Sequence, residues 1–126
     1  MPITFEWDND EHTILKFVYK DPVTVAEIRQ LSEGVEPMLD SVSHRVVSIS
    51  DATRVTRLPD DLLASYPLLA RGRGFQHPNL VATIIVMNNN LFESLLTIYG
   101  KLYGKLIVTH NFEEAYRKAG ELVTHN

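Results

Sequence analysis

The hydrophobic positions of this chain form short apolar runs that alternate with longer stretches of helical spacing. The most apolar run is Leu80–Met87, in which Thr83 is the one polar residue. A run that is apolar on both faces is typical of a strand covered on both sides of a sheet, so we expect it to be central and fully buried. Shorter runs rich in β-branched and aromatic residues also predict strands: Thr4–Trp7, Thr13–Val18, Arg45–Ser50 and Lys105–Thr109.

The first helical stretch begins at Thr24, with Glu27 three residues later as in a capping box. Apolar residues then recur at helical spacing as far as Val42. Pro37 interrupts this stretch, and proline removes one backbone hydrogen bond and crowds the preceding turn. We therefore expect a kink or an early end near Glu36.

Three further helices are expected later in the chain. One runs from Asp60 to about Ala70. The next two begin after Asn90 and Asn111, each followed three residues later by a glutamate, and asparagine is a favoured N-cap residue. Near the N-terminus, the polar segment Asp8–Glu11 between the first two strands favours a turn, so these strands should form a hairpin.

These elements together predict the fold class. After the hairpin, strands alternate with helices, and such units are joined by right-handed crossovers into a mainly parallel or mixed sheet. We therefore expect an α/β domain with an N-terminal β-hairpin, about five strands and four helices. A chain of 126 residues can bury one core without disulfides or metals, so residues 1–126 should form a single domain.

Charge and composition exclude several classes of protein. The net charge of −4 argues against nucleic acid as a partner, because phosphate binding needs a concentrated basic surface. The absence of cysteine excludes disulfides and thiolate chemistry. No apolar run approaches the ~20 residues of a membrane helix, and the first residues lack the pattern of a signal peptide. We expect a cytoplasmic protein without membrane insertion.

The most informative segment follows the strand predicted at Arg45–Ser50. It reads Asp-Ala-Thr-Arg-Val-Thr-Arg-Leu-Pro-Asp over residues 51–60. This segment resembles the signature of the STAS domain family in its SpoIIAA-like branch, roughly Asp-Leu-Ser-Gly-Val-Thr-Phe-Ile-Asp-Ser. Four positions match without gaps: Asp51, Thr53, Val55 and Thr56. The resemblance in element order covers nearly the whole chain.

The same segment also departs from the family pattern. Ala52, Arg54 and Arg57 replace the leucine, glycine and phenylalanine of the pattern. Pro59 stands in place of the acidic residue, and Asp60 in place of the phosphorylatable serine. The resemblance therefore implies the fold of the family but not its phosphorylation switch.

Regulatory members of this family dock a partner kinase or an anti-sigma factor at the loop and helix start that follow the signature strand. The resemblance places the corresponding surface of this chain at Asp51–Asp61. It implies a non-enzymatic regulatory or protein-binding module, with Asp60 as a fixed negative charge at a helix N-terminus.

Two other functions remain open. Polar residues gather where the parallel strands should end, and loops at this edge favour anions. With Arg54 and Arg57 they could bind an anionic or amphipathic small molecule, which would require an apolar pocket of several hundred cubic ångströms. An enzyme using Asp51 and His110 as an acid–base pair is the third possibility. The candidate binding residues are Asp51, Thr53, Arg54, Thr56, Arg57, Asp60, Asn88, Asn89 and His110.

No metal or cofactor is expected from the remaining motifs. His12, His44 and His77 each precede a predicted strand and so should lie at the amino edge of the sheet, without the helical spacing of metal ligands. The segment Tyr99–Lys105 repeats Tyr-Gly-Lys around a leucine. Small residues and tyrosines suit a homodimer contact, but the same segment also reads as a core tyrosine and a helix end.

Overall fold

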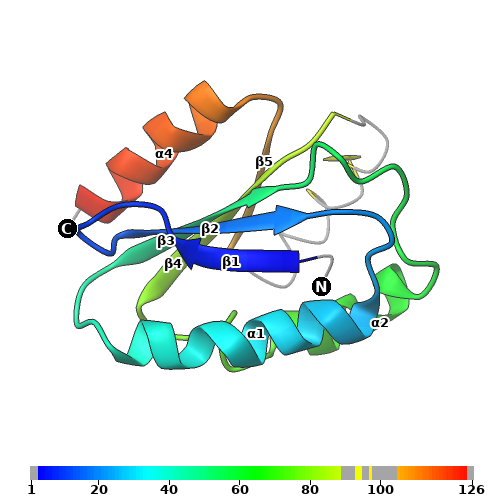
Figure 1. Ribbon diagram of the computed structural model, residues 1–126, viewed down its shortest axis with the longest axis horizontal. Helices are drawn as coiled ribbons and strands as arrows, with labels where there is room; N and C mark the ends of the chain where they lie inside the picture. The colour runs from blue at the N-terminus through cyan, green and yellow to red at the C-terminus, as the bar shows by residue number, and fades with distance from the viewer. Residues whose placement is uncertain (1–2, 89–92, 95–96, 98–104, 125–126) are drawn as a thin grey trace.

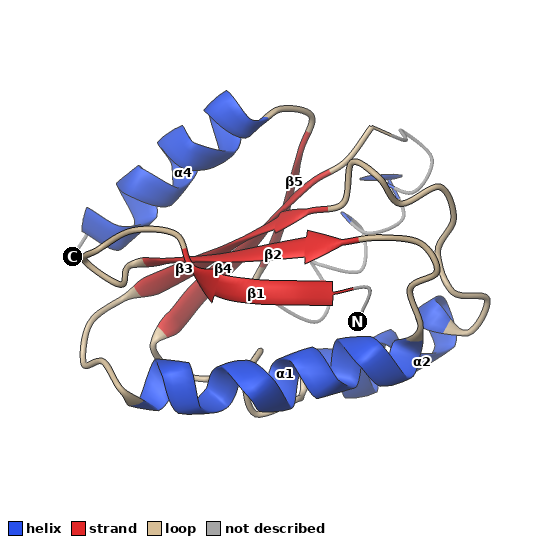
Figure 2. Ribbon diagram, in the orientation of Figure 1, coloured by secondary structure: helices blue, strands red, loops and turns tan. Residues whose placement is uncertain are grey.

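The structure, a computed structural model, describes residues 3–88, 93–94, 97 and 105–124, apart from the side chain of Leu63. Within these residues one five-stranded sheet is covered by α1 and α2 on one face and by α4 on the other (Figures 1 and 2). The strands are β1 Ile3–Trp7, β2 Ile14–Tyr19, β3 Val46–Asp51, β4 Leu80–Val86 and β5 Leu106–Thr109. The helices are α1 Val25–Asp40, α2 Leu62–Ala70 and α4 Phe112–Thr124.

The strand order is β1-β2-β3-β4-β5. The β1–β2 pair is antiparallel, and the other three pairs are parallel. The predicted α/β class, N-terminal hairpin and mixed sheet are therefore confirmed. Three helices lie within the described residues, whereas the helix predicted after Asn90 falls mostly outside them.

The prediction that Leu80–Met87 is fully buried is wrong at alternate positions. Leu80, Ala82, Ile84 and Val86 are buried, but the residues between them are only half-buried. The middle of the sheet is instead β3, whose first five residues are all buried. Two serines made β3 look less buried in the sequence, and both are hydrogen-bonded on the face that α1 and α2 cover.

Helix α1 begins as predicted but ends later. The backbone N–H of Glu27 donates to Thr24 Oγ1 at 3.2 Å, which caps the helix. The helix then continues through Pro37 to Asp40, so the expected early end near Glu36 is wrong. Proline is tolerated here because it lies in the last turn, where the carbonyl one turn earlier loses a single donor.

The starts of α2 and α4 differ in how they are capped. Helix α2 begins at Leu62, and its N-cap Asp61 makes no capping hydrogen bond. Asp60 therefore lies before the helix rather than at its N-terminus, which corrects the prediction. Helix α4 begins as expected, because Asn111 Oδ1 accepts the N–H of Glu114 at 2.7 Å.

Two layers of core fix the sheet between its helices. On one face, Leu15 and Phe17 pack with Val35 and Leu39 of α1. On the other face, strand residues pack with Ala115 and Ala119 of α4. All of these side chains are fully buried. Among the described helices, none is long and apolar enough to cross a membrane.

Candidate functional site

The segment between β3 and α2, residues 52–61, is the signature loop. It lies at the carboxyl edge of the sheet, because the register aligns Asp51 with Val18 of β2 and Val86 of β4. Its side chains divide between two surfaces. Ala52 is buried, whereas Arg54 and the residues Thr56, Arg57 and Asp60 are exposed. The loop therefore has an apolar inner side and a polar outer side.

Asp51 shapes the start of this loop. Its carboxylate accepts the backbone N–H of Thr53 at 3.0 Å and the Thr53 hydroxyl at 2.6 Å. This arrangement is a local turn of the kind that aspartate favours. The structure thus brings two of the predicted site residues, Asp51 and Thr53, together, and their contact holds the start of the loop.

A second carboxylate fixes the middle of the loop. Asp21, which lies before α1, accepts the backbone N–H of Thr56 at 3.0 Å and also the Thr56 hydroxyl. Nothing in the sequence predicts that Asp21 pairs with Thr56. The contact ties the signature loop to the segment that leads into α1.

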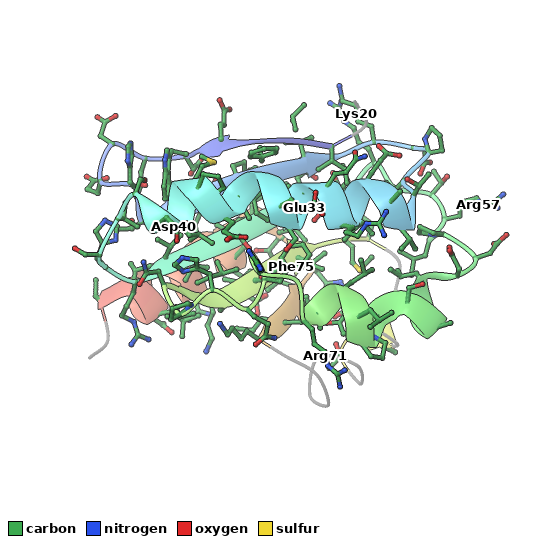
Figure 3. All side chains as sticks on the ribbon, turned by 90° about the horizontal axis from the view of Figure 1, so that it is seen from below. Lys20, Glu33, Asp40, Arg57, Arg71 and Phe75 are labelled. Carbon is green, nitrogen blue, oxygen red and sulfur yellow. The ribbon has the colours of Figure 1, made fainter. Side chains whose placement is uncertain are left out.

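The arginines of the loop lie on its outer side. Arg57 projects from the edge of the domain (Figure 3), and its guanidinium is 3.6 Å from the Asp60 carboxylate, with both side chains largely exposed. Exposed ion pairs of this kind contribute at most about 1 kcal/mol to stability. Arg54 is exposed as well. Both arginines are therefore free to contact other molecules without holding the fold.

The remaining candidates at this edge do not gather around Asp51. Asn88 is exposed, and Asn89 lies outside the described residues. His110 Nε2 is 2.9 Å from the Glu93 carboxylate. Strand β4 separates the strands that carry Asp51 and His110. In the described part of the chain these two residues thus have different partners, and the acid–base pair expected from the sequence is not formed.

Beneath the signature loop lies a cavity of about 140 Å³, which we call the loop cavity. The loop contributes Ala52, Val55 and Leu58 to its wall. Helix α2 contributes Leu69, and β4 contributes Ile85. The lining is mainly apolar, and it combines segments that are far apart in the sequence. Sequence reasoning missed this cavity; the apolar residues within the polar loop indicate only the part of the wall that the loop supplies.

The residue at position 52 is small and lies on the wall of this space. The STAS pattern has leucine there, and this chain has alanine, which is 8% exposed and lines the loop cavity. A smaller side chain in a packed interior leaves volume unless its neighbours collapse into it. Alanine at position 52 therefore occupies less of the loop cavity than the leucine of the STAS pattern would.

A few polar groups also line the loop cavity. The Tyr19 hydroxyl is 3.2 Å from Ser50 Oγ, and burial raises the pKa of Tyr19 to about 12. Lys105 and Thr83 lie on another part of the wall. Burial lowers the pKa of Lys105 from its usual value. The cavity thus joins an apolar lining to a small number of hydrogen-bonding groups, which is the usual composition of a ligand site.

Comparison with solved structures shows one strong likeness. An uncharacterised protein of the DUF3478 family with a SpoIIAA-like fold, from Shewanella loihica PV-4, superposes with a TM-score of 0.65 at 17% sequence identity. The match covers 93% of this chain and 91% of the other. The fold of this chain is SpoIIAA-like. No protein-family model matches the sequence, and none of the curated proteins matches it.

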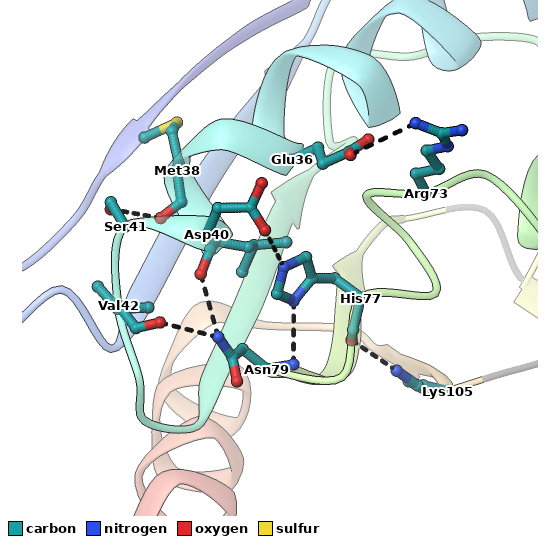
Figure 4. A network of polar contacts seen from close by, with 10 residues as sticks. Glu36, Met38, Asp40, Ser41, Val42, Arg73, His77, Asn79 and Lys105 are labelled. Atoms are coloured by element: carbon teal, nitrogen blue, oxygen red, sulfur yellow. Dashed lines mark hydrogen bonds and ion pairs between the residues drawn. The ribbon is translucent and has the colours of Figure 1, made fainter.

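The opposite, amino edge of this SpoIIAA-like fold carries a separate polar network (Figure 4). His77 Nε2 is 2.7 Å from Asp40 Oδ1, and the N–H of Asn79 donates to His77 Nδ1 at 3.1 Å. The Asn79 side chain donates in turn to the carbonyls of Leu39 and Val42. These bonds fix the segment before β4 against the end of α1.

The histidines expected at the amino edge have separate surroundings. His12 stacks on Trp7 with ring centroids 4.6 Å apart, and His77 pairs with Asp40. No group of three metal-ligating side chains occurs within the described ranges. The Tyr-Gly-Lys repeat proposed for a homodimer contact lies outside the described residues, apart from Lys105.

Proposed function

We propose that this SpoIIAA-like domain is a binding module whose ligand is a small amphipathic molecule held in the loop cavity. The observation that carries the proposal is the apolar cavity under the signature loop, with a few polar groups on its wall. Ligand sites are typically apolar clefts with few hydrogen-bonding groups. The proposal requires no catalytic residue.

The size of the loop cavity limits the ligand. Its volume of about 140 Å³ is close to that of cavities that hold a benzene molecule. It is smaller than the several hundred cubic ångströms expected from the sequence, which corresponds to the roughly 300–1,000 Å³ of sites for drug-sized ligands. The buried part of the ligand is therefore a short alkyl chain or a single ring.

Substitution of Ala52 by leucine tests this function. Leucine should fill part of the loop cavity with little loss of stability, because the STAS pattern carries leucine at this position. In wild-type protein, hexanamide should shift the backbone amide NMR signals of Ala52, Val55 and Met87, with a Kd on the order of 1 mM. Ala52→Leu should weaken this binding at least about tenfold.

Ala26→Leu is the matched control, because Ala26 is exposed on α1 and does not line the loop cavity. This variant should bind hexanamide as the wild type does. If hexanamide shifts no signal around the cavity in the wild type, or if Ala52→Leu binds it unchanged, the cavity is not the binding site.

A second candidate function is favoured by the outer side of the signature loop. Arg54, Thr56, Arg57 and Asp60 are all exposed there, next to one another in sequence. The guanidinium group makes paired hydrogen bonds to carboxylates and phosphates, so this side suits an acidic protein partner. We propose a regulatory protein of the kinase or anti-sigma type as that partner, on the resemblance of the loop to the STAS signature.

The double variant Arg54→Ala, Arg57→Ala tests this second function. Both side chains are exposed and their ion pairing is weak, so the melting temperature should change by no more than a few degrees, less than about 1 kcal/mol. Quantitative pull-down from the native organism should recover less partner with this variant than with the wild type.

Arg71→Ala, Arg73→Ala is the matched control, since it removes the same charge from exposed positions outside the loop. If both double variants recover equally less partner than the wild type, the loss is an effect of net charge and not of the loop. Unfolding of the loop variant would instead make Arg54 and Arg57 structural.

A further inference from the structure

Lys105 brings a positive charge to the wall of the loop cavity. It lies directly before β5 and beside β4, where the N–H of Thr83 donates to the Lys105 carbonyl at 3.0 Å. Both residues line the cavity. Among the described lining residues, Lys105 is the one with a formal charge, and no described carboxylate lies within ion-pair distance of it.

The ammonium group is held in a fixed position. Lys105 Nζ donates to the Leu80 carbonyl at 2.6 Å and to the His77 carbonyl at 3.2 Å (Figure 4 shows the second bond). The His77–Asp40 contact anchors the segment that carries these carbonyls. A lysine has three N–H donors, and its contacts with the described residues use two of them, so the third can bind a ligand.

A partly buried cation without a carboxylate partner is unfavourable, because charge loses hydration on burial. The lowered pKa of Lys105 reflects this loss. A ligand carboxylate would offset it. Arg54 and Arg57, which the sequence suggested as anchors for an anion, lie on the outer side of the loop and do not line the cavity.

We propose that Lys105 anchors the carboxylate of the cavity ligand, which is therefore a short-chain or monocyclic carboxylic acid. This inference rests on the proposed function of the loop cavity. One ammonium matches one negative charge. Thr83 also lines the cavity, and its hydroxyl accepts a hydrogen bond from Ser48 at 3.1 Å, so the hydroxyl hydrogen can donate to a polar atom of the ligand.

The test compares hexanoate with hexanamide, which have the same alkyl chain and differ in charge. In the wild type, hexanoate should bind at least about tenfold more tightly, as expected of a hydrogen bond between charged groups. Lys105→Met should abolish this preference and leave hexanamide binding within about threefold. The control Lys118→Met removes a lysine of α4, on the opposite face of the sheet, and should keep the preference.

The outcomes separate the two proposals. If neither compound binds the wild type, both the cavity function and the anchor are wrong. If both bind with equal affinity, the cavity function stands and the anchor is wrong. If hexanoate remains preferred in Lys105→Met, another group binds the carboxylate and the anchor is again wrong.

Lys105→Met leaves the His77 and Leu80 carbonyls without a donor, so it can affect folding. Lys105→Gln is the second variant, because its amide keeps N–H donors and removes the charge. It should likewise lose the preference for hexanoate. A preference retained in folded Lys105→Gln would overturn the inference.

Discussion

Gly74→Ala should destabilise the domain by about 4 kcal/mol or more, a large part of the roughly 5–15 kcal/mol by which a typical domain is stable. A Cβ atom at this position would lie 2.1 Å from the Ser32 carbonyl oxygen and 2.7 Å from a Val35 methyl group. The first neighbour is backbone in the middle of α1, which cannot move aside. The N–H of Gly74 also donates to Ser32 Oγ at 3.0 Å, so any retreat of the loop breaks that bond.

Gly120→Ala is the matched control for this substitution. Gly120 lies within α4, and no described atom outside the backbone of this helix comes within 4 Å of the Cβ that alanine would add. Alanine in a helix interior should raise the free energy of unfolding by about 0.5–1 kcal/mol. Urea unfolding monitored by circular dichroism checks both variants. A Gly74→Ala protein as stable as the wild type would contradict the close packing of residues 71–79 on α1.

The free energy of unfolding should fall as the pH rises from 10 to 12. Burial raises the pKa of Tyr19 from 10.0 to about 12 in the folded domain. The folded state therefore holds its proton more tightly than the unfolded chain. This contribution is fully present below pH 10 and is lost as the pH approaches 12. Its upper limit is about 2.7 kcal/mol, at 1.36 kcal/mol per pKa unit.

Tyr19→Phe isolates this effect. The variant should be less stable by about 1 kcal/mol at pH 8, because Ser50 loses its hydrogen-bond partner. Between pH 10 and 12, however, its stability should fall less steeply than that of the wild type. The raised pKa values of Tyr66 and Tyr116 persist in the variant, so some decline remains. Parallel pH profiles for the two proteins would refute the role assigned to Tyr19.

The fold was largely predictable because its signals are local. The caps at Thr24 and Asn111 and the apolar runs of the strands are visible in the sequence, and each proved to be correct. One error concerns which strand lies in the middle of the sheet, because contacts between distant segments determine this. Ser48 and Ser50 are polar, yet their hydrogen bonds to other strands allow β3 to occupy the middle of the sheet.

The site was predictable only on its outer side. Exposed polar residues such as Arg54 and Arg57 follow from the composition of the loop. The loop cavity does not, because it is formed by side chains from α1, α2, the sheet and the loop together. Lys105 could not be identified as a wall residue, since the sequence gives no distance between the start of β5 and the segment before β4.

The signature loop is short, and its inner and outer sides belong to two different candidate binding sites. The same ten residues supply one wall of the loop cavity and the exposed arginines of the outer side. The contact between Asp21 and Thr56 also ties the middle of this loop to the segment before α1. A ligand in the cavity and a protein partner on the outer side would thus contact the same loop. Any cooperativity between them must be reciprocal: each would change the affinity for the other by the same factor.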